Sequence, residues 1–206
     1  AGGADMDDLQ LTGGDASATV TYNVGPTADA GTITTVLTGG ETQTIMFTGL
    51  EPIEDTQTAL NAVINASTGN DTISVTDTTT MASDPALNVS FNNAFEQYSF
   101  TNKTNVVVNA GDGGDKINLN YSDANRMAAN LSDLTVNAGA GNDTVNIQQN
   151  HEGSLNGDAG SDLFVFSDGT VVSGLIDGGA DADSLNFAAD TDGIVISLTT
   201  LVSGMA

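Results

Sequence analysis

Aspartate recurs at one fixed place in a Gly-rich hexamer that occurs five times along the chain. The repeating segments, each a hexamer with flanking residues, begin at Asn65, Asn109, Asn137, Asn156 and Asp177. Gly supplies the positive φ angles of tight turns, and a Gly-rich turn can point its backbone carbonyls inward. Calcium takes six to eight oxygen ligands at about 2.3–2.6 Å, from carboxylates and carbonyls of this kind. The chemistry predicted for these turns is therefore calcium binding.

The carboxylates of successive turns are expected to face one another. Strands of neighbouring coils lie roughly 4.8 Å apart, and like charges at that spacing repel unless a cation lies between them. The shortest steps, 19 and 21 residues between starts at 137, 156 and 177, predict the best geometry. The predicted metal ligands are Asp112, Asp115, Asp143, Asp158, Asp162, Asp181 and Asp183. Alternatively, Asn and Asp only stabilise the turns, with Asn side chains forming ladders from coil to coil.

Catalytic chemistry has little support in the residue types. The chain lacks Cys, and His151 is its only histidine, flanked by Asn and Glu in what reads as an exposed loop. A polysaccharide lyase would need several basic residues to hold an acidic sugar, whereas Lys and Arg total 3. We therefore predict that the protein is not an enzyme.

Alternating apolar residues after each hexamer predict the elements that position the turns. Ile73 and Val75, or Val145 and Ile147, stand two apart, which is typical of a short strand with one buried face. A second short apolar strand precedes most hexamers, and helical periodicity is nearly absent. A coil of about 20 residues with two or three strands indicates an all-β fold, a parallel β-solenoid, over residues 61–206. The step from 65 to 109 predicts a degenerate copy within residues 87–100.

The predicted interior contains the alternating residues of all five copies. These are Ile73, Val75, Ile117, Leu119, Val145, Ile147, Phe164, Phe166, Leu185 and Phe187. Residues 1–60 lack the hexamer but alternate as strands, so they are expected to form an N-terminal β segment that caps or links the solenoid.

The net charge of −24 narrows the choice of partners. Such a surface repels nucleic-acid phosphate and anionic lipid, and no apolar run approaches the length of a membrane span. Divalent cations are the expected partners, although the acidity would also suit a high-salt habitat. The opening Ala-Gly-Gly-Ala predicts a processed or excised piece of a longer chain.

These motifs resemble those of two protein families. Residues 138–146 read Ala-Gly-Ala-Gly-Asn-Asp-Thr-Val-Asn, which resembles the repeats-in-toxin nonapeptide Gly-Gly-x-Gly-x-Asp-x-Φ-x in all but its first Gly. Here one hexamer occurs per coil, whereas that family runs its nonapeptides in tandem. The wider pattern, with "FTGLEPIEDT" at 47–56, resembles repeat units of very large secreted bacterial surface proteins. These resemblances imply a calcium-bound β-roll and an extracellular or cell-surface location.

Two functional classes follow from these expectations. The first is a structural extracellular protein: an adhesin stalk, surface-layer component or filament subunit. Its open ends, including the strand-like run at 194–198, predict head-to-tail self-association. The alternative is a polysaccharide-acting enzyme or carbohydrate-binding module on the same fold, with a cell-surface polysaccharide as its partner.

Overall fold

The structure is an all-β fold, as the sequence predicts. It is a computed structural model that describes residues 8–13, 17–25, 27, 30–50, 52–91 and 97–191. Nearly all regular structure in these residues is β-strand, with one short helix, α1 (Asp123–Ala128). None of the described segments forms a helix long and apolar enough to cross a membrane.

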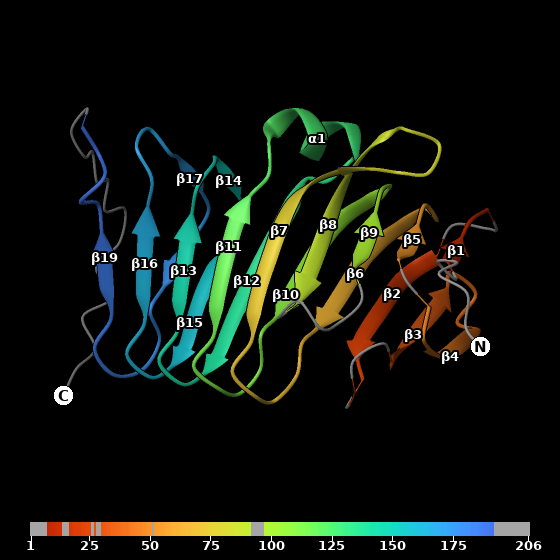
Figure 1. The fold of residues 1–206 in the computed structure, drawn as a ribbon, viewed down its shortest axis with the longest axis horizontal. Coiled ribbons are helices and arrows are strands. Elements are labelled where there is room, and N and C mark those ends of the chain that lie inside the picture. Colours follow the sequence, from red (N-terminus) through yellow and green to blue (C-terminus); the bar gives the residue numbers. More distant parts are fainter. Residues whose placement is uncertain are drawn as a thin grey trace, which may run out of the picture.

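Two large sheets contain most of the strands (Figure 1). The first has the spatial order β1 (Leu9–Leu11), β5 (Ile53–Asp55), β9 (Tyr98–Phe100), β8 (Pro85–Phe91), β7 (Thr72–Thr79), β11 (Lys116–Asn120), β13 (Thr144–Ile147), β16 (Leu163–Phe166) and β19 (Ser184–Asn186). The second has the order β18 (Ile176–Asp177), β15 (Leu155–Ala159), β12 (Asp133–Ala140), β10 (Lys103–Asn109), β6 (Ala59–Asn65), β2 (Ser17–Val24), β3 (Ala30–Leu37) and β4 (Thr42–Thr48). A third, small sheet pairs β14 (His151–Glu152) with β17 (Val172–Ser173).

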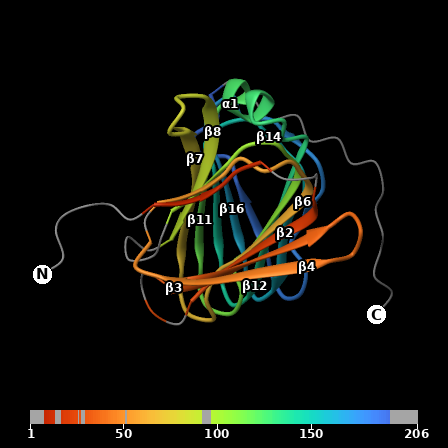
Figure 2. The same cartoon turned by 90° about the vertical axis from the view of Figure 1, so that its right-hand side faces the viewer.

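The chain passes between the two large sheets through each Gly-rich hexamer. Strands β6, β10, β12, β15 and β18 of the second sheet are followed by β7, β11, β13, β16 and β19 of the first. Equivalent strands of neighbouring coils pair in parallel and in register, so Asn109 lies opposite Asn65 and Val145 opposite Ile117. Figure 2, which looks along the stack from its N-terminal side, shows the sheets on either side of the interior.

The predicted extra coil within residues 87–100 is wrong. Strand β10 pairs directly with β6, so the 44-residue step is a single coil. The intervening residues form β8, which pairs antiparallel with β7, and β9, which pairs antiparallel with β8. A buried antiparallel strand has the same two-residue apolar alternation as a parallel one, so this pattern does not reveal strand direction.

The N-terminal segment continues both sheets. Strand β2 pairs in parallel with β6, with Val20 opposite Ala62, and is followed by antiparallel β3 and β4. Strand β1 pairs in parallel with β5, which in turn pairs in parallel with β9. Residues on both sides of the predicted boundary near residue 60 therefore share a sheet, and the capping or linking role of residues 1–60 stays a prediction.

The interior matches the predicted core except at the last coil. Eight predicted inward residues are buried: Ile73, Val75, Ile117, Leu119, Val145, Ile147, Phe164 and Phe166. Phe187 is half-buried and stacks on Phe166 with ring centroids 4.3 Å apart. The prediction for Leu185 is wrong, because its side chain is 47% exposed. Strand β19 ends its sheet in the described part of the chain, so Leu185 lacks a following coil there.

Candidate functional site

The Gly-rich turns stack so closely that backbone geometry dictates their residues. Gly141 has a φ of 136°, and a Cβ atom at this position would lie 1.6 Å from the carbonyl oxygen of Gly113 in the preceding coil. Asp158 and Asp181 stand where other copies have Gly, and their φ angles are 70° and 74°. Asp is among the few residues that tolerate this left-handed region. These two aspartates therefore add carboxylates to their turns without changing the conformation of the turn.

The aspartates at the position that the five hexamers share form a ladder. In each copy after the first, one carboxylate oxygen of the aspartate, Oδ1, accepts a hydrogen bond from the backbone N–H of the equivalent aspartate in the preceding coil. The nitrogen–oxygen distances are 2.7 Å (Asp71 to Asp115), 2.6 Å (Asp115 to Asp143), 2.9 Å (Asp143 to Asp162) and 3.0 Å (Asp162 to Asp183). These aspartates thus satisfy backbone donors that the turns would otherwise leave without an acceptor.

The second carboxylate oxygen of the ladder is buried. The Oδ2 atoms of Asp115, Asp143 and Asp162 have no hydrogen-bond partner among the described residues. In the first copy, by contrast, Oδ2 of Asp71 accepts from the backbone nitrogen of Ser67 at 3.0 Å and from its hydroxyl at 2.7 Å. The later copies have Gly or Asp in place of that serine, so they lack the hydroxyl. Three buried oxygens are left with spare capacity to accept a proton or a cation.

Burial and like charge both act on the ladder. Burial raises the pKa of Asp115 to about 6, and the neighbouring charges of Asp143, Asp71 and Asp112 add to the effect, whereas the hydrogen bond from Asp71 opposes it. Burial likewise raises the pKa values of Asp143 and Asp162. The charge of Asp158 raises both of these. Asp143, Asp162 and the exposed Asp158 therefore bring three negative charges close together in neighbouring turns.

The other predicted ligands lie on the surface of the turns. Asp112, Asp158, Asp181 and Asp183 are exposed, and Asp183 is the last described step of the ladder. Within the described ranges, no group of three or more His, Cys, Asp or Glu side chains is placed to hold a metal ion. The structure thus aligns Asp115, Asp143 and Asp162 in the interior and leaves the outer carboxylates in solvent. The seven-residue metal prediction remains untested.

Asparagines form a second ladder, as the sequence suggests. The side-chain nitrogens of Asn109, Asn137 and Asn156 each donate to the amide oxygen of the preceding coil's Asn at 2.7 Å. Asn65 extends this ladder to Asn23 in β2, also at 2.7 Å. Sequence reasoning missed Asn23 because residues 9–60 contain no hexamer to align it. The stacking of equivalent strands therefore begins at β2, before the first hexamer.

The expectation that His151 is exposed is wrong. Its side chain is buried, and Nδ1 lies 2.8 Å from the hydroxyl oxygen of Tyr121. Burial lowers the pKa of His151 to about 4, so the ring is neutral at pH 7. Its polar neighbours in the sequence suggested solvent, but strand β14 turns His151 inward and leaves Glu152 half-buried.

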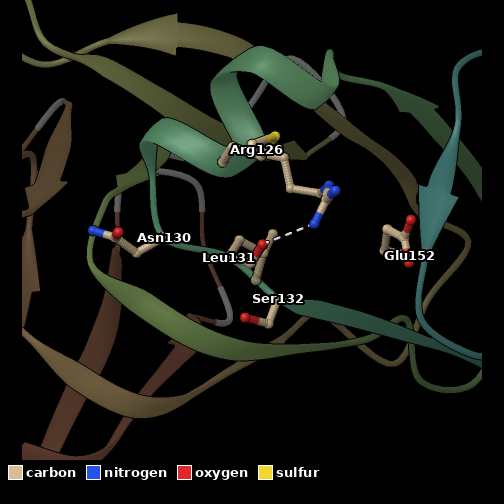
Figure 3. A pocket seen from close by; sticks show the side chains of 6 residues that line it. Arg126, Asn130, Leu131, Ser132 and Glu152 are labelled. Carbon is tan, nitrogen blue, oxygen red and sulfur yellow. Dashed lines mark hydrogen bonds between the residues drawn. The ribbon is translucent and has the colours of Figure 1, made fainter.

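A shallow hollow of about 510 Å³ lies beside α1 (Figure 3). Its lining residues are Arg126, Met127, Asn130, Leu131, Ser132 and Glu152. The Arg126 guanidinium donates from Nη1 to the Leu131 carbonyl at 3.0 Å, and its Nε lies 3.4 Å from Oδ1 of Asp123. The arginine thus holds the loop after α1, and none of the predicted ligands lines the hollow.

Comparison with protein-family models, with curated proteins and with solved structures finds no match. The function of this chain is therefore inferred from its stacked coils and its aspartate-containing turns.

Proposed function

We propose that the protein is a structural segment of an extracellular bacterial surface protein, of the kind that forms an adhesin stalk, surface layer or filament. The observation that carries this proposal is the repetition of like residues, in register, from coil to coil. Asn lies opposite Asn, Asp hydrogen-bonds to Asp, and apolar residues lie opposite apolar residues. An architecture of this type gains length by adding coils and has mechanical continuity along its axis.

The finer architecture that we propose is a β-solenoid. Three features support it: the chain alternates between two facing sheets, the successive coils pair in parallel, and the turns between the sheets superimpose. The antiparallel strands β3, β4 and β8 are then additions to this repeat, two at its N-terminal end and one within the first long coil.

The placement of aromatic side chains favours this function over carbohydrate binding. Sugar-binding surfaces need exposed aromatic faces, and nine of the ten Phe and Tyr residues are described. Phe187 is half-buried, and the other eight are buried: Tyr22, Phe47, Phe91, Tyr98, Phe100, Tyr121, Phe164 and Phe166. The described aromatics thus belong to the interior and offer no platform for a sugar.

Head-to-tail association is proposed at the C-terminal end of the stack. Strands β18 and β19 end their sheets in the described part of the chain, where Leu175 and Leu185 are 61% and 47% exposed. The predicted strand at 194–198 lies outside the described residues. A sheet edge beside exposed apolar side chains favours pairing with the opposite end of another copy, and such contacts build open filaments.

The substitution Leu185→Lys should prevent this association. A lysine at the proposed contact would place a charge against an apolar surface, and inward-pointing charges protect sheet edges from pairing. We expect wild type to form particles that grow with concentration in sedimentation velocity and filaments in electron micrographs, and the variant to remain monomeric. Met127→Lys is the matched control, because Met127 is 68% exposed on α1, away from the stack ends. Monomeric wild type, or equal assembly of both variants, would refute the contact.

Calcium binding is proposed at the turns of Asp143, Asp158 and Asp162. The unpartnered Oδ2 atoms of the two ladder residues and the charge of Asp158 support it. The ladder oxygens Oδ1 are already bonded to backbone N–H groups, so further ligands would come from carbonyls and water. A site with few protein carboxylates binds calcium weakly, on the order of 10⁻⁴–10⁻³ M.

Calcium at millimolar concentration should raise the melting temperature, and Asp158→Asn should remove most of that increase. Asp158 contributes no ladder hydrogen bond that would be lost, and Asn tolerates its positive φ angle. Asp84→Asn is the control, because Asp84 is exposed and lies outside the Gly-rich hexamers. Melting would be followed by circular dichroism at matched ionic strength. An equal effect of sodium chloride, or an undiminished calcium effect in the Asp158 variant, would favour general charge screening instead.

A further inference from the structure

One of the chain's three basic residues is completely buried. The side chains of Lys103 in β10 and Asp55 in β5 have no solvent exposure, and Nζ lies 3.1 Å from Oδ1 of Asp55. In a chain of net charge −24, an exposed lysine would find carboxylates at little cost. This amine is instead buried beside one particular carboxyl group.

The surroundings fix both groups and exclude water. The Tyr98 hydroxyl donates to the second oxygen of the carboxylate, Oδ2, at 2.6 Å. Nζ also donates to the backbone oxygens of Thr101, Gln57 and Asp55, at 3.0, 2.5 and 3.4 Å. Tyr98 and Phe100 stack beside the pair with ring centroids 5.9 Å apart. The nitrogen and the carboxyl group thus meet in one orientation, and such positioning can supply much of the free energy of activation of a two-group reaction.

The ion pair is expensive to keep in this place. Removing two charges from water costs several kcal/mol per ion, and mutual attraction repays this only in part. Burial lowers the pKa of Lys103, although Asp55 opposes that shift, and this favours transfer of a proton from the amine. A reaction that leaves both groups uncharged would remove the cost.

We propose that Lys103 and Asp55 condense to form an intramolecular amide bond. Proton transfer from Nζ to Oδ1 first yields a neutral amine and a carboxylic acid. The nitrogen lone pair then attacks Cγ of Asp55, and a second proton passes from nitrogen to Oδ1. The Cγ–Oδ1 bond breaks and Oδ1 leaves as water. The ammonium and the carboxylate are thus converted into one amide and one water molecule, with charge conserved and no oxidant or reductant required.

Tyr98 is placed to assist this condensation. Negative charge develops on Oδ2 as nitrogen attacks Cγ, and the tyrosine hydroxyl donates to that atom. Burial and the nearby Asp55 raise the pKa of Tyr98 well above its ordinary value, so the hydroxyl keeps its proton and remains a donor. In the product, Oδ2 is the amide oxygen and keeps this hydrogen bond.

The bond would connect the two sheets across the interior. Strand β5 belongs to the first sheet and β10 to the second, and the joined residues are 48 positions apart in sequence. The amide would tie the N-terminal segment to the first long coil, so that pulling on the chain could not separate them without breaking a covalent bond.

Mass spectrometry of the purified, denatured full chain tests the proposal directly. We expect an intact mass lower than the sequence mass by one water molecule. Trypsin cuts after Lys103, Lys116 and Arg126, the only basic residues. An amide at Lys103 blocks the first cut, so residues 1–116 should appear as one fragment. An unchanged mass together with a released 1–103 fragment would overturn the proposal and leave a buried ion pair.

Three variants assign the bond. Lys103→Arg should restore the full mass, because a guanidinium is too weak a nucleophile to form this amide. Lys116→Arg, at an exposed lysine, should retain the water loss and serves as the matched control. Tyr98→Phe removes the hydroxyl but keeps the ring, and should convert more slowly after refolding, giving a mixture of both masses. Persistence of the mass deficit in Lys103→Arg would place the dehydration elsewhere and refute the assignment, and full-rate conversion of Tyr98→Phe would refute the role of the tyrosine.

Discussion

Replacement of Gly141 by alanine should destabilise the protein severely, by on the order of 3–5 kcal/mol. The φ angle of 136° disfavours any residue with a Cβ atom. More importantly, that Cβ atom would lie 1.6 Å from the carbonyl oxygen of Gly113, a backbone atom of the preceding coil. Because the obstruction is backbone on both sides, two coils must separate, and hydrogen bonds of the adjacent ladders would lengthen with them.

Gly169→Ala is the matched control for this substitution. Gly169 also has a positive φ angle, 69°, but a Cβ atom there would meet nothing within 4 Å. Its replacement should cost only the conformational penalty, about 1 kcal/mol. The free energies of unfolding would be compared by urea denaturation of both variants and wild type. Similar costs at the two positions would mean that the coils do not stack as closely as the structure has them.

The same close stacking explains why much of the fold was predictable from the sequence. A turn that admits only Gly, Asn or Asp leaves a recognisable hexamer, and a strand between solvent and a shared interior leaves a two-residue alternation. Those two signals located the buried pairs from Ile73 to Phe166. They did not reveal strand direction, so β8 was mistaken for part of another coil. Nor did they reveal where stacking ends, so Leu185 was assigned to the interior.

The candidate sites were less predictable because they depend on contacts between distant residues. The alignment of Asp115, Asp143 and Asp162 followed from the repeat, yet their use as acceptors for backbone N–H groups depends on the register of adjacent turns. The Asp55–Lys103 pair arises because β5 and β10 lie in different sheets that face each other. No short-range pattern encodes such a pair, and the same holds for His151 and Tyr121.

Asp115→Asn should stabilise the protein at pH 7 in the absence of divalent cations. The amide keeps an oxygen that can accept the hydrogen bond from Asp71 N–H, and it removes a buried charge. The folded-state pKa of Asp115 is about 6, above the ordinary value of 3.8, so the folded state binds this proton more tightly than the unfolded state. Wild type therefore loses stability as pH rises from about 4 to about 6, and the loss is complete above that range. The corresponding gain for the variant is about 2–3 kcal/mol.

The measurement is the difference in unfolding free energy between variant and wild type, from pH 3.5 to pH 8 in chelator. Burial lowers the pKa of His151 in the folded state to about 4. The unfolded state therefore binds this proton more tightly, and the protein loses stability as pH falls from about 6.5 to about 4. That effect is common to both chains and cancels in the difference. The advantage of Asp115→Asn should vanish below about pH 4. If calcium binds the ladder carboxylates, saturating calcium should reverse the order, because the cation compensates a charge that asparagine lacks. A variant less stable than wild type at pH 7 in chelator would show that the buried charge is itself stabilising.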